Sequence, residues 1–165
     1  MEMQHKVYSN NLIGVRRNTL LSREHSMEYV TTSNGVIYID DSAAISVDKT
    51  LASIASVGER VVLIIGGSDL KSDYCLLQQI VKSNVVAIIA LNSWSNRVFE
   101  SFIRIAPVII AAGSVEESVS IAQKLAMGGD VVLFSPGCSS NDIFDNYKNR
   151  GDVFKQAVNT LTKKK

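Results

Sequence analysis

The segment RVVLIIGG, residues 60–67, is an apolar run that ends in two glycines. Two similar runs follow it, VVAIIAL at residues 85–91 and DVVLF at residues 130–134. A strand that is apolar on both faces must be covered on both faces, which is typical of parallel sheets. The stretches between these runs have helical patterns and serve as crossovers, so the sequence predicts an α/β fold.

The remaining elements are predicted from periodicity and from capping and turn residues. Ser114 and Glu117 form a capping-box pattern at the start of a helix that should end at Gly128-Gly129. A short strand is expected at residues 107–111. The other predicted helices are near residues 46–56, 73–82 and 92–104, with two short ones near 142–149 and 152–161.

Before the first of these helices, two strand-like runs at residues 27–32 and 35–40 flank Asn34-Gly35. Asn-Gly supplies the positive φ angles of a tight hairpin turn. We therefore expect a three-layer, Rossmann-like αβα sandwich whose mostly parallel sheet carries an antiparallel edge hairpin. Residues 1–24 read as an irregular tail or the remnant of a linker, and residues 25–165 as one domain.

Composition narrows the class of protein. The chain has 165 residues and a formal charge of +1, which gives no electrostatic case for nucleic acid or an anionic membrane. The N-terminus has no apolar signal region, so a cytoplasmic protein is expected. Cys75 and Cys138 are interpreted as buried free thiols. His5 and His25 lack metal-ligand spacing, and no metal site is predicted.

The carboxyl ends of parallel strands meet at one edge of the sheet, where such folds bind ligands. The strand ends that converge there are residues 38–42, 66–72, 91–93 and 134–140. Lys71, Ser139 and Ser140 would form an anion site, with the serines at a helix start. On the alternative interpretation, Lys71 is solvated and the serines only cap a helix. No GxGxxG or GxxxxGK[ST] phosphate loop is present.

Several segments resemble, in order, the D-glutamate-adding branch of the Mur ligase family. Residues 25–30, HSMEYV, resemble the family's HRLEYV, and residues 34–46 resemble NGVxFINDSKATN. Residues 66–74, GGSDLKSDY, resemble GGxxKxxDF. The longest match is residues 135–154, SPGCSSNDIFDNYKNRGDVF, with SPACASxDQFKNFxxRGxxF. The resemblance covers roughly residues 25–160 and concerns only the family's C-terminal domain.

The resemblance implies an ATP- and magnesium-dependent ligase of peptidoglycan synthesis whose nucleotide machinery lies in upstream domains of the same or another chain. No cofactor, and no catalytic residue, is expected in this chain. D-glutamate or another small carboxylate would bind Lys71, Ser139, Ser140 and Asn141, with Tyr147 packed beside it. Asp41 and Ser42 would face the nucleotide. Asp142 and Arg150 would hold the loop together.

Four departures leave the function open, and one of them is Ser46 in place of the last asparagine of NDSKATN. Ser26 replaces the linker arginine, and Ala43 and Ile45 replace the lysine and threonine of NDSKAT. One hypothesis is the amino-acid-binding domain of a ligase, inactive alone. The alternative is a non-catalytic module that keeps an anion or amino-acid site, and a Rossmann-type nucleotide domain is disfavoured by the missing glycine fingerprint. The chain could be a complete short protein or part of a longer one.

Overall fold

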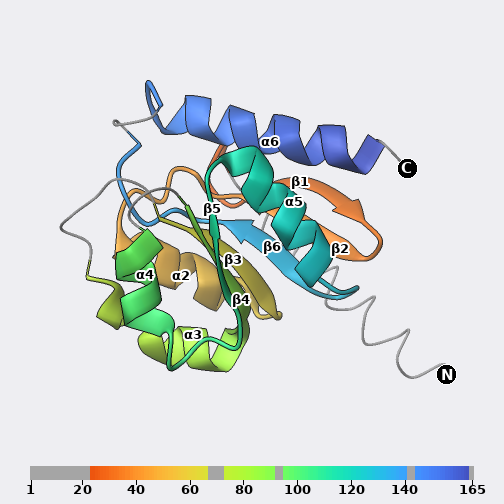
Figure 1. Cartoon of the computed structure of the whole chain (residues 1–165). Helices are drawn as coiled ribbons and strands as arrows, with labels where there is room; N and C mark the ends of the chain where they lie inside the picture. The colour runs from red at the N-terminus through yellow and green to blue at the C-terminus, as the bar shows by residue number, and fades with distance from the viewer. Residues whose placement is uncertain (1–22, 67–72, 92–94, 141–143, 164–165) are drawn as a thin grey trace, which may run out of the picture.

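The protein folds around one six-stranded sheet with the order β1-β2-β6-β3-β4-β5 (Figure 1). The structure is a computed structural model and describes residues 23–66, 73–91, 95–140 and 144–163. The neighbours from β2 to β5 all pair parallel, and β1 pairs antiparallel with β2, as the sequence predicted. The strands are β1 Glu28–Ser33, β2 Val36–Asp40, β3 Val61–Ile65, β4 Val85–Leu91, β5 Ile109–Ala112 and β6 Val131–Phe134.

Helices cover both faces of the sheet and create two apolar cores (Figure 1). The first face carries α2 Val47–Val57, the 3-10 helix η1 Tyr74–Leu77, α3 Gln78–Asn84 and α4 Ser95–Phe102. The second carries α5 Val115–Leu125 and α6 Tyr147–Lys163, which stacks Phe154 on Phe134 of β6. The predicted three-layer α/β/α sandwich is therefore confirmed.

The hairpin turn between β1 and β2 also forms as predicted. Asn34 and Gly35 have φ angles of 52° and 77°, the left-handed pair that a tight two-residue turn requires. A Cβ on Gly35 would lie 3.2 Å from the Cα of Gly128, so the turn packs closely against the loop before β6. This loop and the hairpin turn lie at the amino edge of β6.

Two predictions from the sequence are wrong. Cys75 is exposed, because η1 turns Tyr74 and Leu77 three residues apart into the core and leaves Cys75 outside, while Cys138 is buried as expected. The two short C-terminal helices are one helix, α6, which runs through Gly151. Gly151 lies within this helix, and its lack of a side chain leaves room for His25, Ser42 and Asp40.

In the part of the chain that the structure describes, α5 already ends at Leu125, before the predicted glycine stop. At its start, Ser114 Oγ accepts the amide of Glu117, and Glu117 returns to the amide of Gly113. The capping box therefore closes one residue earlier than the standard pattern. No helix among the described residues has the length and apolar character needed to cross a membrane.

Candidate functional site

The strands β2, β3 and β6 end side by side, and the segments that follow them form what we call the rim. The rim comprises residues 40–44 after β2, Gly66 after β3 and residues 135–140 after β6. Backbone bonds join its parts: the amide of Asp41 donates to the carbonyl of Phe134 at 2.8 Å, and that of Gly66 to the carbonyl of Pro136 at 3.0 Å. Open parallel sheets bind ligands at this edge.

Arg150 of α6 connects two rim segments through hydrogen bonds. Its Nη2 donates to the carbonyl of Ser42 at 2.8 Å, and its Nη1 to the carbonyls of Cys138 and Ser139 at 3.1 and 3.2 Å. The side chain is 2% exposed, and burial lowers its pKa from the ordinary value. A buried guanidinium with its charge directed at three carbonyl oxygens acts as a structural brace.

Asp41 lies at the centre of the rim. Its Oδ1 accepts the amide of Met27 at 3.1 Å, and its Oδ2 accepts the hydroxyl of Ser135 at 2.7 Å. Burial raises the pKa of Asp41, and hydrogen bonds from Ser53, Ser135 and the Met27 amide partly offset this rise. Asp41 is thus a buried carboxylate that is held in one orientation.

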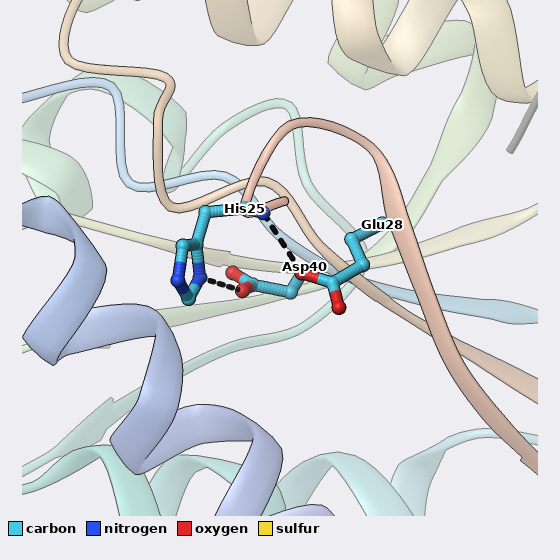
Figure 2. Close-up of side chains that lie close together, drawn as sticks. All are labelled: His25, Glu28 and Asp40. Atoms are coloured by element: carbon cyan, nitrogen blue, oxygen red, sulfur yellow. Dashed lines mark hydrogen bonds and ion pairs between the residues drawn. The ribbon is translucent and has the colours of Figure 1, made fainter. Parts of the chain in front are cut away.

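Next to Asp41, His25 and Asp40 form a second buried polar group (Figure 2). His25 Nδ1 is 2.7 Å from Asp40 Oδ2, and Asp40 Oδ1 accepts the amide of Ser42 at 2.9 Å. Burial raises the pKa of Asp40, while its bonds to His25 and Ser42 act in the opposite direction. Glu28 Oε2 accepts the backbone amide of His25 at 2.8 Å and is 3.3 Å from Lys155 Nζ.

His25, Glu28 and Asp40 bring their ligand atoms within 4.8 Å of one another, a spacing that could hold a metal ion. Their oxygens, however, already accept N–H groups of His25, Ser42 and Lys155. A cation would have to displace these donors and would lie near the ammonium group of Lys155. The arrangement therefore suits a hydrogen-bonded clasp better than a metal centre.

A pocket of about 270 Å³ opens beside Asp41, between residues 26–27 and α2. It combines one carboxylate, two hydroxyls, one ammonium group and several small apolar side chains. Lys49 is exposed and is the pocket's only cation among the described residues. The lining residues are Ser26, Met27, Asp41, Ala43, Ala44, Lys49, Ala52 and Ser53.

Curated relatives of this chain include ligases that carry one name. The chain is 38% identical over 139 residues to the UDP-N-acetylmuramoylalanine–D-glutamate ligase of Pelodictyon phaeoclathratiforme, a match that covers 84% of the chain and 30% of that protein. It is 36% identical over 161 residues to the ligase of that name from Salinibacter ruber, covering 98% and 34%. No family model matches the chain. The chain thus spans about a third of these curated relatives.

Solved structures agree in fold. A domain from a putative UDP-N-acetylmuramate:L-alanyl-gamma-D-glutamyl-meso-diaminopimelate ligase of Haemophilus ducreyi aligns with a TM-score of 0.55 at 19% identity, covering 82% of this chain and 98% of that one. The chain is a domain of the Mur ligase family. A murein peptide ligase from Psychrobacter arcticus gives a TM-score of 0.60 at 13% identity, covering 84% of this chain and 30% of that protein.

The structure brings most of the predicted site residues of this Mur ligase domain to the rim. Ser42 is fully buried, with its amide bonded to Asp40 and its carbonyl to Arg150. Ser139 is half-buried and Ser140 is buried. Tyr147, the first residue of α6, packs edge-on against the His25 ring at 6.3 Å between centroids.

Lys71 and Asn141 lie outside the described residues of the Mur ligase domain, so their roles stay predictions, as does that of Asp142. The predicted helix start near residue 142 must be revised, since α6 begins at Tyr147. The amide of Phe144 does donate to the carbonyl of Ser140 at 3.0 Å, a bond of helical spacing just after the serines.

Sequence analysis missed the polar residues that support Asp41 from α2. Thr50 is fully buried and donates to the carbonyl of Ser135 at 3.2 Å, and Ser53 faces Asp41. Sequence analysis rejected His25 as a metal ligand and otherwise noted it only as the first residue of the HSMEYV match. One signal could have pointed to it: a glycine within a helix, Gly151, indicates that another group approaches the helix closely.

Proposed function

We propose that this Mur ligase domain is the C-terminal, amino-acid-binding domain of a UDP-N-acetylmuramoylalanine–D-glutamate ligase, inactive on its own. The observation that carries the proposal is the 36–39% identity to proteins of that name over most of the chain. The sequence has no phosphate-loop motif, so ATP and Mg²⁺ would be held mainly by other domains. Cytoplasmic peptidoglycan synthesis is the expected setting.

Amide formation of this kind needs an amine held close to an activated carboxyl group, and much of the rate comes from that positioning. D-glutamate carries two carboxylates that can serve as handles. The rim offers Ser139 and Ser140, while Lys71 would supply a cation. With Asn141 and Tyr147 beside them, these residues would hold the amino acid and leave its amine free to attack.

The pocket beside Asp41 has groups that suit a nucleotide. The carboxylate of Asp41 and the hydroxyls of Ser26 and Ser53 can bond ribose hydroxyls, and Lys49 can face a phosphate. ATP would supply the phosphoryl group that activates the acceptor carboxyl. MurF from Thermotoga maritima, whose structure is similar to that of this chain, was solved in complex with ADP.

A second candidate is a non-catalytic module that binds a small carboxylate. It is favoured by the apolar side chains at Ala43 in the rim and at Ile45 just after it, where the family motif has lysine and threonine. Ala43 lines the pocket, and Ile45 is 47% exposed without a polar replacement. On this hypothesis the domain still binds an amino acid but no longer supports amide formation.

Titration with D-glutamate, followed by NMR, tests the proposed site. D-glutamate should perturb the amides of Ser139 and Ser140, and L-glutamate should do so more weakly. Lys71→Ala should weaken D-glutamate binding roughly 10- to 100-fold, the worth of a charge-assisted hydrogen bond. Lys82→Ala, in the last turn of α3 just before β4, is the matched control. Equal perturbation in parent and Lys71→Ala would refute the assignment.

A further inference from the structure

Three parts of the chain that are distant in sequence converge on His25. Residues 23–27, which we call the N-terminal segment, contribute the histidine itself. β2 contributes Asp40, and α6 contributes Asp152, whose Oδ1 is 3.7 Å from His25 Nε2. The other groups facing His25 are Glu24 at 3.8 Å, Glu28 through the His25 amide, and the ring of Tyr147.

The N-terminal segment is fastened to the rim by paired hydrogen bonds. His25 bonds Asp40 through its ring and accepts the amide of Ala43 through its carbonyl at 2.9 Å. Two residues later, the amide of Met27 donates to Asp41. A displacement of this segment would therefore be transmitted directly to Asp41, the carboxylate at the centre of the rim.

The backbone of this segment is held in a costly conformation. His25 and Met27 have φ angles of 63° and 51°, in the left-handed region that side chains other than glycine rarely adopt. Such conformations persist where surrounding contacts over-determine them, and they gather at functional sites. Here the bonds to Asp40, Asp41 and Ala43 provide those contacts.

α6 is shaped to admit this cluster. A Cβ on Gly151 would overlap His25 Nδ1 and Ser42 Oγ, and would lie 2.6 Å from Asp40 Oδ2. The helix thus leaves room at one residue for the histidine, the carboxylate and the rim serine. Close packing on this scale fixes the positions of all three groups.

We propose that His25 and Asp40 are positioning residues that hold the Asp41–Ser42 backbone for ligand binding and make its geometry depend on the N-terminal segment. When Asp40 is ionised it can only accept, and Nδ1 of His25 is then the donor of this hydrogen bond. The ligand part of this inference rests on the proposed amino-acid and nucleotide site. The positioning part rests only on the contacts above.

The test compares Asp40→Ala with Asp40→Asn. Alanine removes both bonds. Asparagine keeps an acceptor for Ser42 and can donate its amide to His25, provided the ring moves its proton from Nδ1 to Nε2. The control is Asp130→Ala, which removes another buried carboxylate at the opposite edge of the sheet, where it accepts the amide of Met127.

Amide hydrogen exchange at Met27 and Ala43 reports positioning, because neither amide bonds Asp40 itself. Asp40→Ala should speed exchange at both at least tenfold beyond the change in Asp130→Ala. Asp40→Asn should restore near-parent exchange, and imidazole ¹⁵N shifts should show the moved proton. The inference is overturned if exchange in Asp40→Ala only matches the control, or if Asp40→Asn behaves like alanine.

D-glutamate affinity separates this inference from the proposed function. If the parent binds D-glutamate, Asp40→Ala should weaken binding at least tenfold, with Asp40→Asn within about threefold of the parent. If the parent does not bind it, the proposed function fails, while the exchange and ¹⁵N results still decide whether the clasp positions the rim. Unchanged affinity in Asp40→Ala would contradict the ligand part of the inference.

Discussion

The two edges of the sheet use their polar residues differently. At the amino edge, Asn34-Gly35 makes a local turn, and the buried carboxylate of Asp130 pairs with Arg60, whose side chain is 57% exposed. At the carboxyl edge, Asp40, Asp41 and Arg150 are all at least 97% buried and bond across long sequence separations. Burying charge is costly unless it is paired, and among the described residues Arg150 Nε and Ser42 Oγ are buried there without a hydrogen bond. The buried contacts at the carboxyl edge therefore fix the positions of its polar groups, whereas the residues at the amino edge mainly allow the chain to turn.

The largest effect should come from removing the brace at the carboxyl edge. Arg150→Ala takes the guanidinium donor from three carbonyls, two of them buried, and should lower the free energy of unfolding by about 3–5 kcal/mol. Arg60→Ala, at the amino edge, removes the exposed partner of buried Asp130, which still accepts the amide of Met127, and should cost only about 1–2 kcal/mol. Chemical denaturation measures both. Similar losses in the two variants would erase the distinction between the edges.

The same contrast explains what the sequence could predict. The amino-edge turn follows from adjacent residues, because Asn-Gly defines its own backbone angles. The buried strands follow from uninterrupted apolar runs such as residues 85–91. Their parallel order follows from the helical patterns between them. Each of these features depends on residues that are close together in the chain.

The carboxyl-edge contacts could not be predicted in this way. Arg150 meets Ser42 across 108 residues, and Thr50 meets Ser135 across 85. Thr50 and Ser53 look like polar interruptions of the apolar face of α2, because their partners are visible only after folding. Family resemblance placed Asp41 and Ser139 at the site, but it did not show that His25 connects the N-terminal segment to them.

A chimera would show whether the carboxyl edge still supports catalysis. We expect this chain, joined to the first two domains of an active D-glutamate ligase, to run at least about 100-fold below the parent enzyme, because Ala43 and Ile45 cannot donate hydrogen bonds to developing negative charge. Steady-state amide formation measures the loss. The double change Ala43→Lys, Ile45→Thr should recover a measurable part of it. A chimera as fast as its parent would contradict the non-catalytic alternative and show that other donors, such as Lys49, suffice.

Adding a single methyl group to α6 sharpens the comparison further. Alanine normally stabilises a helix by about 1 kcal/mol relative to glycine. Gly151→Ala should reverse that sign and cost about 1–3 kcal/mol, because the methyl group would displace His25 and Asp40. Gly113→Ala, whose Cβ would approach only the side chain of Glu117, is the control and should stay within about 0.5 kcal/mol. Thermal unfolding of both variants measures the difference. Equal stability of the two variants would show that His25 and Asp40 can shift to accept the methyl group on α6.

The smallest change is Asp41→Asn, which nearly preserves shape and removes a buried charge. Because burial raises the folded-state pKa of Asp41, the native protein binds more protons than the unfolded chain between the ordinary and the raised value. The parent's contribution from this carboxyl is therefore fully present below the unfolded pKa and is lost as pH rises through the folded pKa. Asparagine does not titrate, so the stability of the variant relative to the parent should rise across this window and level off above it.

Urea denaturation of both proteins at a series of pH values measures this difference. A difference that stays flat, or that falls as pH rises, would mean that hydrogen bonds from Ser135, Ser53 and Met27 outweigh the cost of burial, and that the carboxyl edge holds its charge without strain.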